Sequence, residues 1–252
     1  MDNSEFLRKA RETIKSQLSV DDLVTKLVEL VDETEKAENT LFKAVYDAYF
    51  LYFPEAAALM QDRDVFIRTV SVSVLRGDVA KILSISSDSM GYDFDDGSIQ
   101  LMTSQVNELN NLAMLMNMAK KHLEDTMFRN YPNLTTIAES MVGARLLQLG
   151  NGINKLAFMP SSKIQVLGAE KALFQRRRGQ KASPKYGVIF KNPLIEGSAQ
   201  DVRGKIARAL SSKISLAAKT DFFSKEDKSE AIRKELTEEI KRITDGAKKS
   251  NR

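Results

Sequence analysis

Basic residues are concentrated in one stretch of the sequence, from Lys163 to Lys219. This stretch holds thirteen lysines and arginines against three acidic residues, a local charge of about +10, whereas the whole chain has a formal net charge of +4. Lysine and arginine bind phosphate groups, so a cluster of this kind indicates an anionic partner such as a nucleic acid. The remainder of the chain is net acidic.

Two of these cations, Lys205 and Arg208, have the spacing of a pair on one face of a helix. The segment 202–219 is predicted to be helical, and residues three apart project from the same side of a helix. No Asp or Glu in this segment can pair with them, which favours a binding role over an ordinary solvated face. Arg203 joins them only if the first helical turn is irregular, as Gly204 would permit.

The other cations of the stretch are weaker or less defined candidates. The three arginines at 176–178 precede Gly179 and would complement the dipole at the end of a helix that begins at Ala169. Lys181 and Lys185 lie in a polar loop and could reach phosphates without fixed geometry. Tyr186 could stack on a base, although an aromatic residue at the start of a strand is more often part of the core.

Composition argues against most enzyme classes. The chain has no cysteine and one histidine, so disulfides, thiolate metal sites and cysteine nucleophiles are excluded, and His122 reads as a surface residue. No P-loop, GxGxxG or HExxH motif is present, and the acidic run DFDDG lacks the ligand spacing of an EF-hand. We therefore expect a protein that is not an enzyme and that needs no metal or cofactor.

Nothing in the sequence indicates export or membrane insertion. The charged N-terminus MDNSEFLRKARETIK lacks the apolar region of a secretion signal. No apolar run approaches the roughly 20 residues of a membrane span. The chain is expected inside the cell.

Two long heptad patterns predict the elements that position the basic region. Spacings of three and four over several heptads favour a coiled coil, and the two patterns end at Pro54 and Pro132. They most simply pair as an antiparallel helical hairpin with a tip of shorter helices, although a compact bundle would have the same spacing. The first seam contains Val20, Leu23, Leu27, Leu30, Thr34, Ala37, Leu41, Ala44, Ala48 and Leu51, and the second contains Met102, Val106, Leu109, Ala113, Met116, Lys120, Leu123 and Met127.

The sequence of the second half of the chain predicts shorter helices and strands. Asn133 is a candidate N-cap for a helix that runs to Gly150 or Gly152. GVIF and PLI, separated by Lys191, Asn192 and Pro193, read as a small β-hairpin. The helix after Asp201 has a predicted buried stripe, and Ser224 with Asp227 resembles a capping box at the start of a charged helix. The stripe consists of Ile206, Leu210, Ile214 and Ala217.

Several motifs of the basic region resemble those of the Nop domain family. They are VLGAEKALF at 166–174, PKYGVIFKNPLI at 184–195, RGKIARAL at 203–210 and SLAAKTDFF at 215–223. The resemblance extends upstream through 131–168 and to YFPE at 52–55, and it covers Val20 to about Phe223. The family comprises scaffold subunits of archaeal and eukaryotic box C/D ribonucleoproteins, together with a pre-mRNA splicing factor.

This resemblance implies a mainly α-helical fold and a set of site residues. Gly168, Ala169 and Glu170 are expected to meet a small ribosomal-protein-like subunit bound to kink-turn RNA. The residues expected to contact the RNA are Lys163, Gln165, Lys171, Lys185, Arg203, Lys205 and Arg208. The residues assigned to the coiled coil and to dimerisation are Leu23, Leu27, Leu30, Leu41, Val106, Leu109 and Met116.

The expected organisation has four parts. A lead-in helix at 1–19 precedes a coiled-coil domain with a helical tip at 20–132, a Nop domain at 133–223 and a charged helix and tail at 224–252. The family's N-terminal domain, which carries the methyltransferase fibrillarin, has no counterpart here, so fibrillarin recruitment is in doubt. The longer QRRRGQK after ALF is a second departure from the family.

The sequence thus predicts an RNA-binding, homodimeric scaffold that supports guided RNA 2′-O-methylation or ribonucleoprotein assembly. Its location would be the cytoplasm of an archaeal cell, or the nucleolus or nucleus of a eukaryote. The alternative is a protein-binding adaptor in which the coiled coil is the active part and the Nop-like domain has lost RNA or fibrillarin binding.

Overall fold

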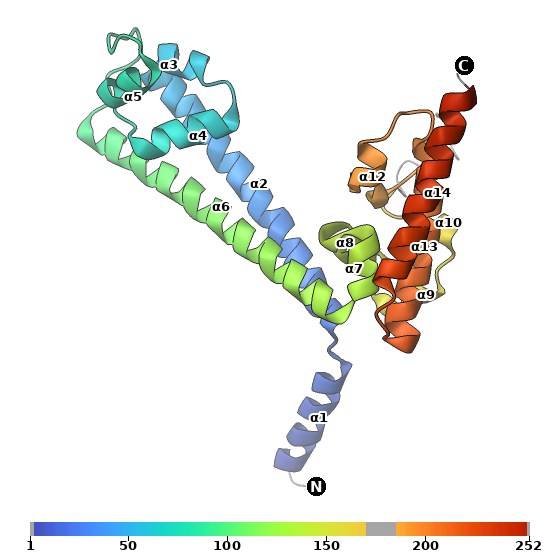
Figure 1. The fold of residues 1–252 in the computed structure, drawn as a ribbon. Coiled ribbons are helices and arrows are strands. Elements are labelled where there is room, and N and C mark those ends of the chain that lie inside the picture. Colours follow the sequence, from blue (N-terminus) through green and yellow to red (C-terminus); the bar gives the residue numbers. More distant parts are fainter. Residues whose placement is uncertain (1–2, 170–184, 251–252) are drawn as a thin grey trace, which may run out of the picture. The chain divides into compact units, whose positions relative to one another are not determined.

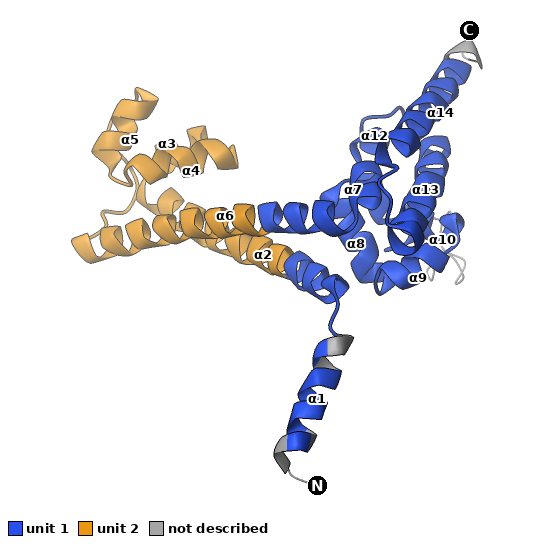
Figure 2. Ribbon diagram, turned by 60° about the horizontal axis from the view of Figure 1, so that its bottom comes forward, with its two compact units in different colours: residues 1–29, 120–252 blue, residues 30–119 orange. Residues whose placement is uncertain are grey.

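The computed structural model describes residues 3–169 and 185–250, and every regular element in those ranges is a helix (Figure 1). The chain divides into two compact units, one of 30–119 and one that combines 1–29 with 120–252 (Figure 2). The predicted all-α class is confirmed. The unit boundaries differ from the expected domain limits, because residues 20–29 and 120–132 of the predicted hairpin belong to the unit that also contains 133–252.

Two long helices, α2 (Val20–Tyr52) and α6 (Asp96–Asn130), contribute to both units. In the unit of 30–119 they run antiparallel, as predicted, and share a core that includes Tyr49 and Leu109. The tip between them consists of three short helices, α3 (Pro54–Leu59), α4 (Arg63–Val72) and α5 (Arg76–Leu83).

The buried seam of α2 is displaced by one residue from the predicted one at many positions. Val24 and Val31 are buried, whereas Leu23 and Leu30 are 46% and 40% exposed. Leu23 and Val24 are both apolar, and so are Leu30 and Val31. Heptad spacing alone therefore could not decide which residue of each pair is buried. Leu27 is buried as expected and Leu41 partly buried. In α6 the prediction holds, with Met102, Val106, Leu109, Leu123 and Met127 buried and Met116 partly buried.

The second unit packs short helices around α13. In α13 the predicted stripe of Ile206, Leu210, Ile214 and Ala217 is fully buried. The unit also contains α1 (Asn3–Gln17), α7 (Pro132–Ala138), α8 (Ser140–Gly150), α9 (Ile153–Phe158), α10 (Ser161–Val166), η1 (Val188–Lys191), α12 (Pro193–Glu196), α13 (Arg203–Lys219), η2 (Thr220–Ser224) and α14 (Ser229–Ser250).

The β-hairpin predicted from GVIF and PLI is wrong. These residues form the 3₁₀ helix η1 and the short helix α12. The Asn192 side chain decides the outcome, because its oxygen accepts from the Leu194 N–H at 3.0 Å and its amide donates to the Ala138 carbonyl at 3.0 Å. Pro193 follows at the first helical position, where the missing N–H costs nothing.

Asn133 is not the N-cap of its helix. The carboxylate of Asp221, in η2, accepts from the backbone N–H groups of Asn133 at 3.2 Å and Leu134 at 2.8 Å. It therefore satisfies the free donors at the start of α7 from a distant part of the sequence. The same carboxylate accepts from the Asn133 side chain at 2.7 Å.

The charged C-terminal helix begins later than predicted. Ser224 ends η2, Lys225 has a left-handed φ of 55°, and α14 starts at Ser229. Asp227 accepts from the Ser229 N–H at 3.0 Å, and the Ser229 side chain together with this N–H lowers the pKa of Asp227 below its usual value. Over the described ranges no helix is long and apolar enough to cross a membrane.

Candidate RNA interface

The segment 185–188 runs alongside α10 and fixes one edge of the predicted interface. The Gln165 side-chain amide donates to the Lys185 carbonyl at 2.7 Å. The Gly187 and Val188 N–H groups donate to the carbonyls of Gln165 and Leu167, both at 2.8 Å. These bonds join residues about twenty positions apart, so Gln165 of α10 lies beside Lys185, and Lys163 is exposed on the same short helix.

Two glycines allow this close approach. A Cβ on Gly187 would lie 1.9 Å from the Leu167 carbonyl oxygen, so no other residue fits. Gly168 has a φ of +87°, a conformation that glycine adopts without strain. Gly168 is exposed and Ala169 is partly exposed, so both are accessible to a partner.

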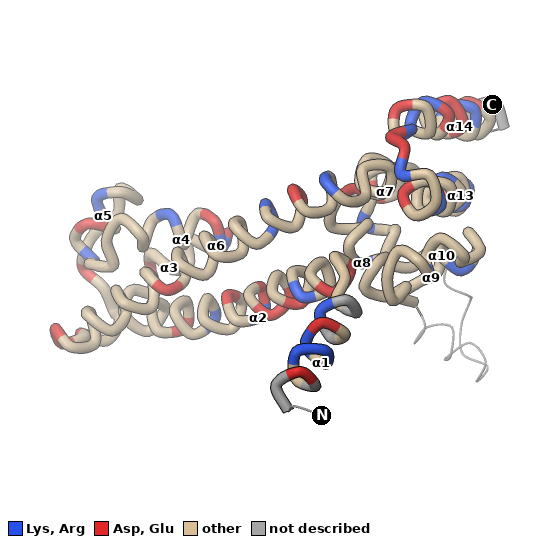
Figure 3. Tube along the Cα trace, turned by 90° about the horizontal axis from the view of Figure 1, so that it is seen from below, with Lys and Arg blue, Asp and Glu red and all other residues tan. Residues whose placement is uncertain are grey.

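Lys205 and Arg208 are exposed on α13, on the side opposite its buried stripe. Neither forms an ion pair with any residue that the structure describes. The Lys185 side chain lies beside the start of α13, with its Cδ 3.9 Å from the position of a Cβ on Gly204. Basic residues of α10 and α13 are marked in Figure 3. This arrangement suits a phosphate backbone, since its cations are not neutralised.

Arg203 differs from Lys205 and Arg208 because its side chain is partly buried and is bonded to backbone carbonyls. Its Nε donates to the Ser198 carbonyl at 2.8 Å and its Nη2 to the Glu196 carbonyl at 3.0 Å. The guanidinium lies 5.6 Å from the Phe190 ring centre, and Phe190 stacks on Tyr186 at 4.9 Å and 12°. Arg203 therefore fixes the turn before α13, and Tyr186 packs against a protein ring.

Some of the predicted site lies outside the described residues. Glu170, Lys171, the arginines at 176–178 and Lys181 fall in this range. Phe190, the ring between Tyr186 and Arg203, was not among the predicted site residues. Its spacing of four from Tyr186 was the available signal, but the expected strand would have placed the two rings differently.

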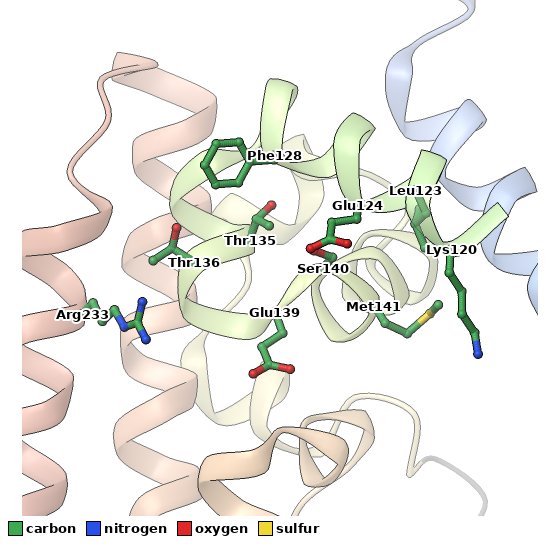
Figure 4. A pocket seen from close by; sticks show the side chains of 10 residues that line it. All are labelled: Lys120, Leu123, Glu124, Phe128, Thr135, Thr136, Glu139, Ser140, Met141 and Arg233. Atoms are coloured by element: carbon green, nitrogen blue, oxygen red, sulfur yellow. The ribbon is translucent and has the colours of Figure 1, made fainter. Parts of the chain in front are cut away.

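A pocket elsewhere in the same unit contains none of the predicted site residues. It has a volume of about 670 Å³ and is formed by α6, α7, α8 and α14 (Figure 4). Glu124 and Glu139 line it together with Lys120 and Arg233. Glu139 has φ 67° and ψ 154°, a strained conformation for a residue with a side chain. The balanced charges of the lining do not favour an anionic ligand.

Comparison with known proteins identifies the family. The Nop family model, described as "snoRNA binding domain, fibrillarin", matches residues 30–245. The chain belongs to the Nop family. This result confirms the resemblance read from the motifs of the basic region.

Relatives of this Nop chain occur in archaea and eukaryotes. An uncharacterized NOP5 family protein of Methanocaldococcus jannaschii is 34% identical over 95% of the chain and 61% of the relative. Nucleolar protein 58 of Schizosaccharomyces pombe is 30% identical over 82% of the chain and 44% of the relative. The chain thus spans about two fifths to three fifths of the length of these relatives.

A solved structure has the same fold. It is a crystal structure of a fibrillarin/Nop5p complex, with a TM-score of 0.56 and 23% identity over 94% of this chain and 80% of the other. At this level of identity the likeness supports the fold of the Nop chain.

Proposed function

We propose that the chain is an RNA-binding scaffold subunit of a box C/D-type ribonucleoprotein. It recognises kink-turn RNA together with the small protein bound to that RNA, and it supports RNP assembly or guided 2′-O-methylation. Membership of the Nop family supports this proposal, and so does the occurrence of nucleolar protein 58 and a NOP5 family protein among the relatives. Fibrillarin, which belongs to the solved complex of similar fold, is a further candidate partner.

The exposed, unpaired pair Lys205 and Arg208 is the observation that carries the RNA contact. Both cations are exposed on α13, and the Lys185 side chain lies beside Gly204 at the start of the same helix. Phosphate contacts of this kind provide affinity that falls with salt, while Gly168 and Ala169 lie where a protein surface can approach closely. Arg203 acts mainly by holding the turn before α13, because its guanidinium is already bonded to two carbonyls.

Binding to a kink-turn RNA tests the proposal. Fluorescence anisotropy is measured with and without the small kink-turn-binding protein, for the wild type and for Lys205→Glu with Arg208→Glu. We expect the variant to bind at least about tenfold more weakly, with a salt slope lower by about two, because two phosphate contacts are lost.

A matched control variant distinguishes the loss of specific contacts at the site from a general effect of net charge. Lys234→Glu with Lys241→Glu makes the same change in charge at exposed positions of α14, and it should retain most of the affinity. Equal losses in both variants would mean that binding depends on overall charge. If the wild type binds no RNA under any of these conditions, the adaptor hypothesis replaces this proposal.

A further inference from the structure

Three phenylalanines form an exposed aromatic cluster, away from every residue assigned above. Phe158 ends α9, and Phe222 and Phe223 lie in η2. Phe158 is 68% exposed and Phe223 61% exposed. The Phe158 ring centre lies 5.5 Å from that of Phe223 and 6.2 Å from that of Phe222, and the last two are 4.8 Å apart, all in edge-to-face geometry.

Local structure holds these rings at the surface. The Lys225 N–H donates to the Thr220 carbonyl, five residues earlier, at 2.9 Å, which makes this turn a π-helix. π-helical turns are rare in proteins as a whole, and those that occur are often found at functional sites. Asp221 occupies the inward-facing position because it caps α7. The phenylalanines that follow it must therefore lie toward solvent.

The third ring, that of Phe158, is exposed for a similar reason. Leu156 and Ala157 of α9 are fully buried, and Met159, which follows the helix, is largely buried. The intervening Phe158 points outward and meets the η2 rings there. A solvated surface gains nothing from exposing two phenylalanines side by side, so a patch of this kind marks an interaction site.

Two cations share a pocket with one ring of the cluster. Phe222 lines a pocket of about 530 Å³ together with Arg129 and Lys225. Its one acidic side chain is Asp221, whose two oxygens already accept three hydrogen bonds from Asn133 and Leu134.

Two more cations precede the rings closely in the sequence, one on α9 and one at the end of α13. Lys155 is one turn before Phe158, and Lys219 is four residues before Phe223, and both are exposed. Within the described ranges these two lysines take no part in an ion pair, and neither do Arg129 and Lys225. The combination of exposed rings and free cations matches the chemistry of nucleotides, which stack through their bases and bind cations through their phosphates.

We propose that the aromatic cluster is a stacking platform for single-stranded RNA. Bases stack on Phe158 and Phe223, while Arg129 and Lys225, with Lys155 and Lys219, bind the phosphates. This inference deepens the proposed RNA-binding function, but it uses no residue of the interface formed by α10 and α13. A single strand is favoured over a duplex, because only unpaired bases present their faces to an aromatic ring.

Fluorescence anisotropy with a labelled twelve-nucleotide oligouridylate tests this site. Phe158→Leu with Phe223→Leu keeps an apolar surface but removes the aromatic faces, and we expect affinity to fall at least about tenfold. Phe158→Tyr with Phe223→Tyr should retain it. Phe50→Leu with Phe128→Leu, at positions 50% and 61% exposed, is the matched control. All these positions are exposed, and circular dichroism checks that each variant is folded.

The outcomes separate this inference from the proposed function. If the leucine variant binds the oligouridylate as tightly as the wild type, the aromatic faces do not contribute to RNA binding and the inference is wrong. If the wild type binds the kink-turn RNA but no oligouridylate, the inference fails while the proposed function stands. Support requires that the leucine variant lose the oligouridylate and keep the kink-turn RNA, and that Lys205→Glu with Arg208→Glu do the reverse.

Discussion

Two tyrosines on α2 differ in what their hydroxyl groups contact. The Tyr49 side chain is fully buried, and its hydroxyl has no hydrogen-bond partner among the residues described. Burial also raises the pKa of Tyr49 above its usual value. The Tyr46 hydroxyl, by contrast, donates to the Ala57 carbonyl at 3.1 Å.

This difference predicts opposite results for the same substitution. Tyr49→Phe removes an unpaired buried polar group and should leave the free energy of unfolding unchanged or raise it by about 1 kcal/mol, whereas Tyr46→Phe should lower it by about 1 kcal/mol. Urea denaturation followed by circular dichroism measures both. A clear loss of stability in Tyr49→Phe would mean that its hydroxyl is bonded, for instance to a buried water.

Candidate RNA-binding residues could be selected from the sequence where charge and spacing suggest their role. They could not be selected where the role depends on hydrogen bonds formed in the folded chain. Lys205 and Arg208 could be selected because their spacing and the absence of nearby acids are visible in the sequence. Arg203 has the same charge, but its role depends on carbonyls of Glu196 and Ser198 that a turn brings to it. No local pattern encodes that geometry.

At the scale of elements, Asp221 links two parts of the chain that are far apart in sequence. Three N–H groups, two of the backbone and one of the Asn133 amide, donate to its carboxylate. Asp221→Asn would place an NH₂ group opposite at least one of these donors. We expect the free energy of unfolding to fall by about 2 kcal/mol, because at least one buried N–H donor loses its acceptor.

The effect should depend on pH, because ionising the buried carboxyl group costs the folded state stability. Burial raises the pKa of Asp221 above the ordinary value of 3.8, against the opposing effect of its hydrogen bonds. The folded state then binds this proton more readily than the unfolded state, so the stability it contributes falls as pH rises through the raised pKa. The loss in Asp221→Asn should be larger near pH 4 than near pH 7 in urea titrations. Asp245→Asn, on the exposed face of α14, should change stability by less than about 0.5 kcal/mol at either pH.

Elements with a long period were predictable, and those fixed by tertiary bonds were not. The two long helices and the stripe of α13 follow from apolar spacing over many residues. The sequence around Asn192 predicts two short strands. The structure has helical turns there instead, and the Asn192 side chain stabilises them by donating to the Ala138 carbonyl. The start of α7 is likewise set by Asp221 rather than by its own residues.

For the whole molecule, two separate hydrophobic cores share the long helices. Val24 and Leu123 pack in the core of one unit, and Val45 and Val106 in the core of the other. Heptad spacing predicted both helices and their antiparallel pairing, but it could not assign their ends to different cores. Only the distribution of buried contacts separates them.

The displaced seam also leaves a candidate surface for self-association. Positions of the predicted seam at intervals of seven are exposed on α2, namely Leu23, Leu30, Ala37, Ala44 and Leu51. Coiled-coil helices pair through two apolar positions in each heptad, and this row supplies one of the two. We propose that a second copy of the chain binds here, since Leu27, Val106 and Leu109 are buried within one chain.

Substitution in this row predicts the oligomeric state. Leu23→Ser with Leu30→Ser removes two apolar contacts from a dimer but little from the fold, because both side chains are already about half exposed. Light scattering coupled to size exclusion should find a dimer for the wild type and a shift toward monomer for the variant. Leu59→Ser with Leu101→Ser, both 62% exposed, is the matched control and should remain dimeric. A dimer that survives the first pair and dissociates with the second would place the interface away from this row of α2.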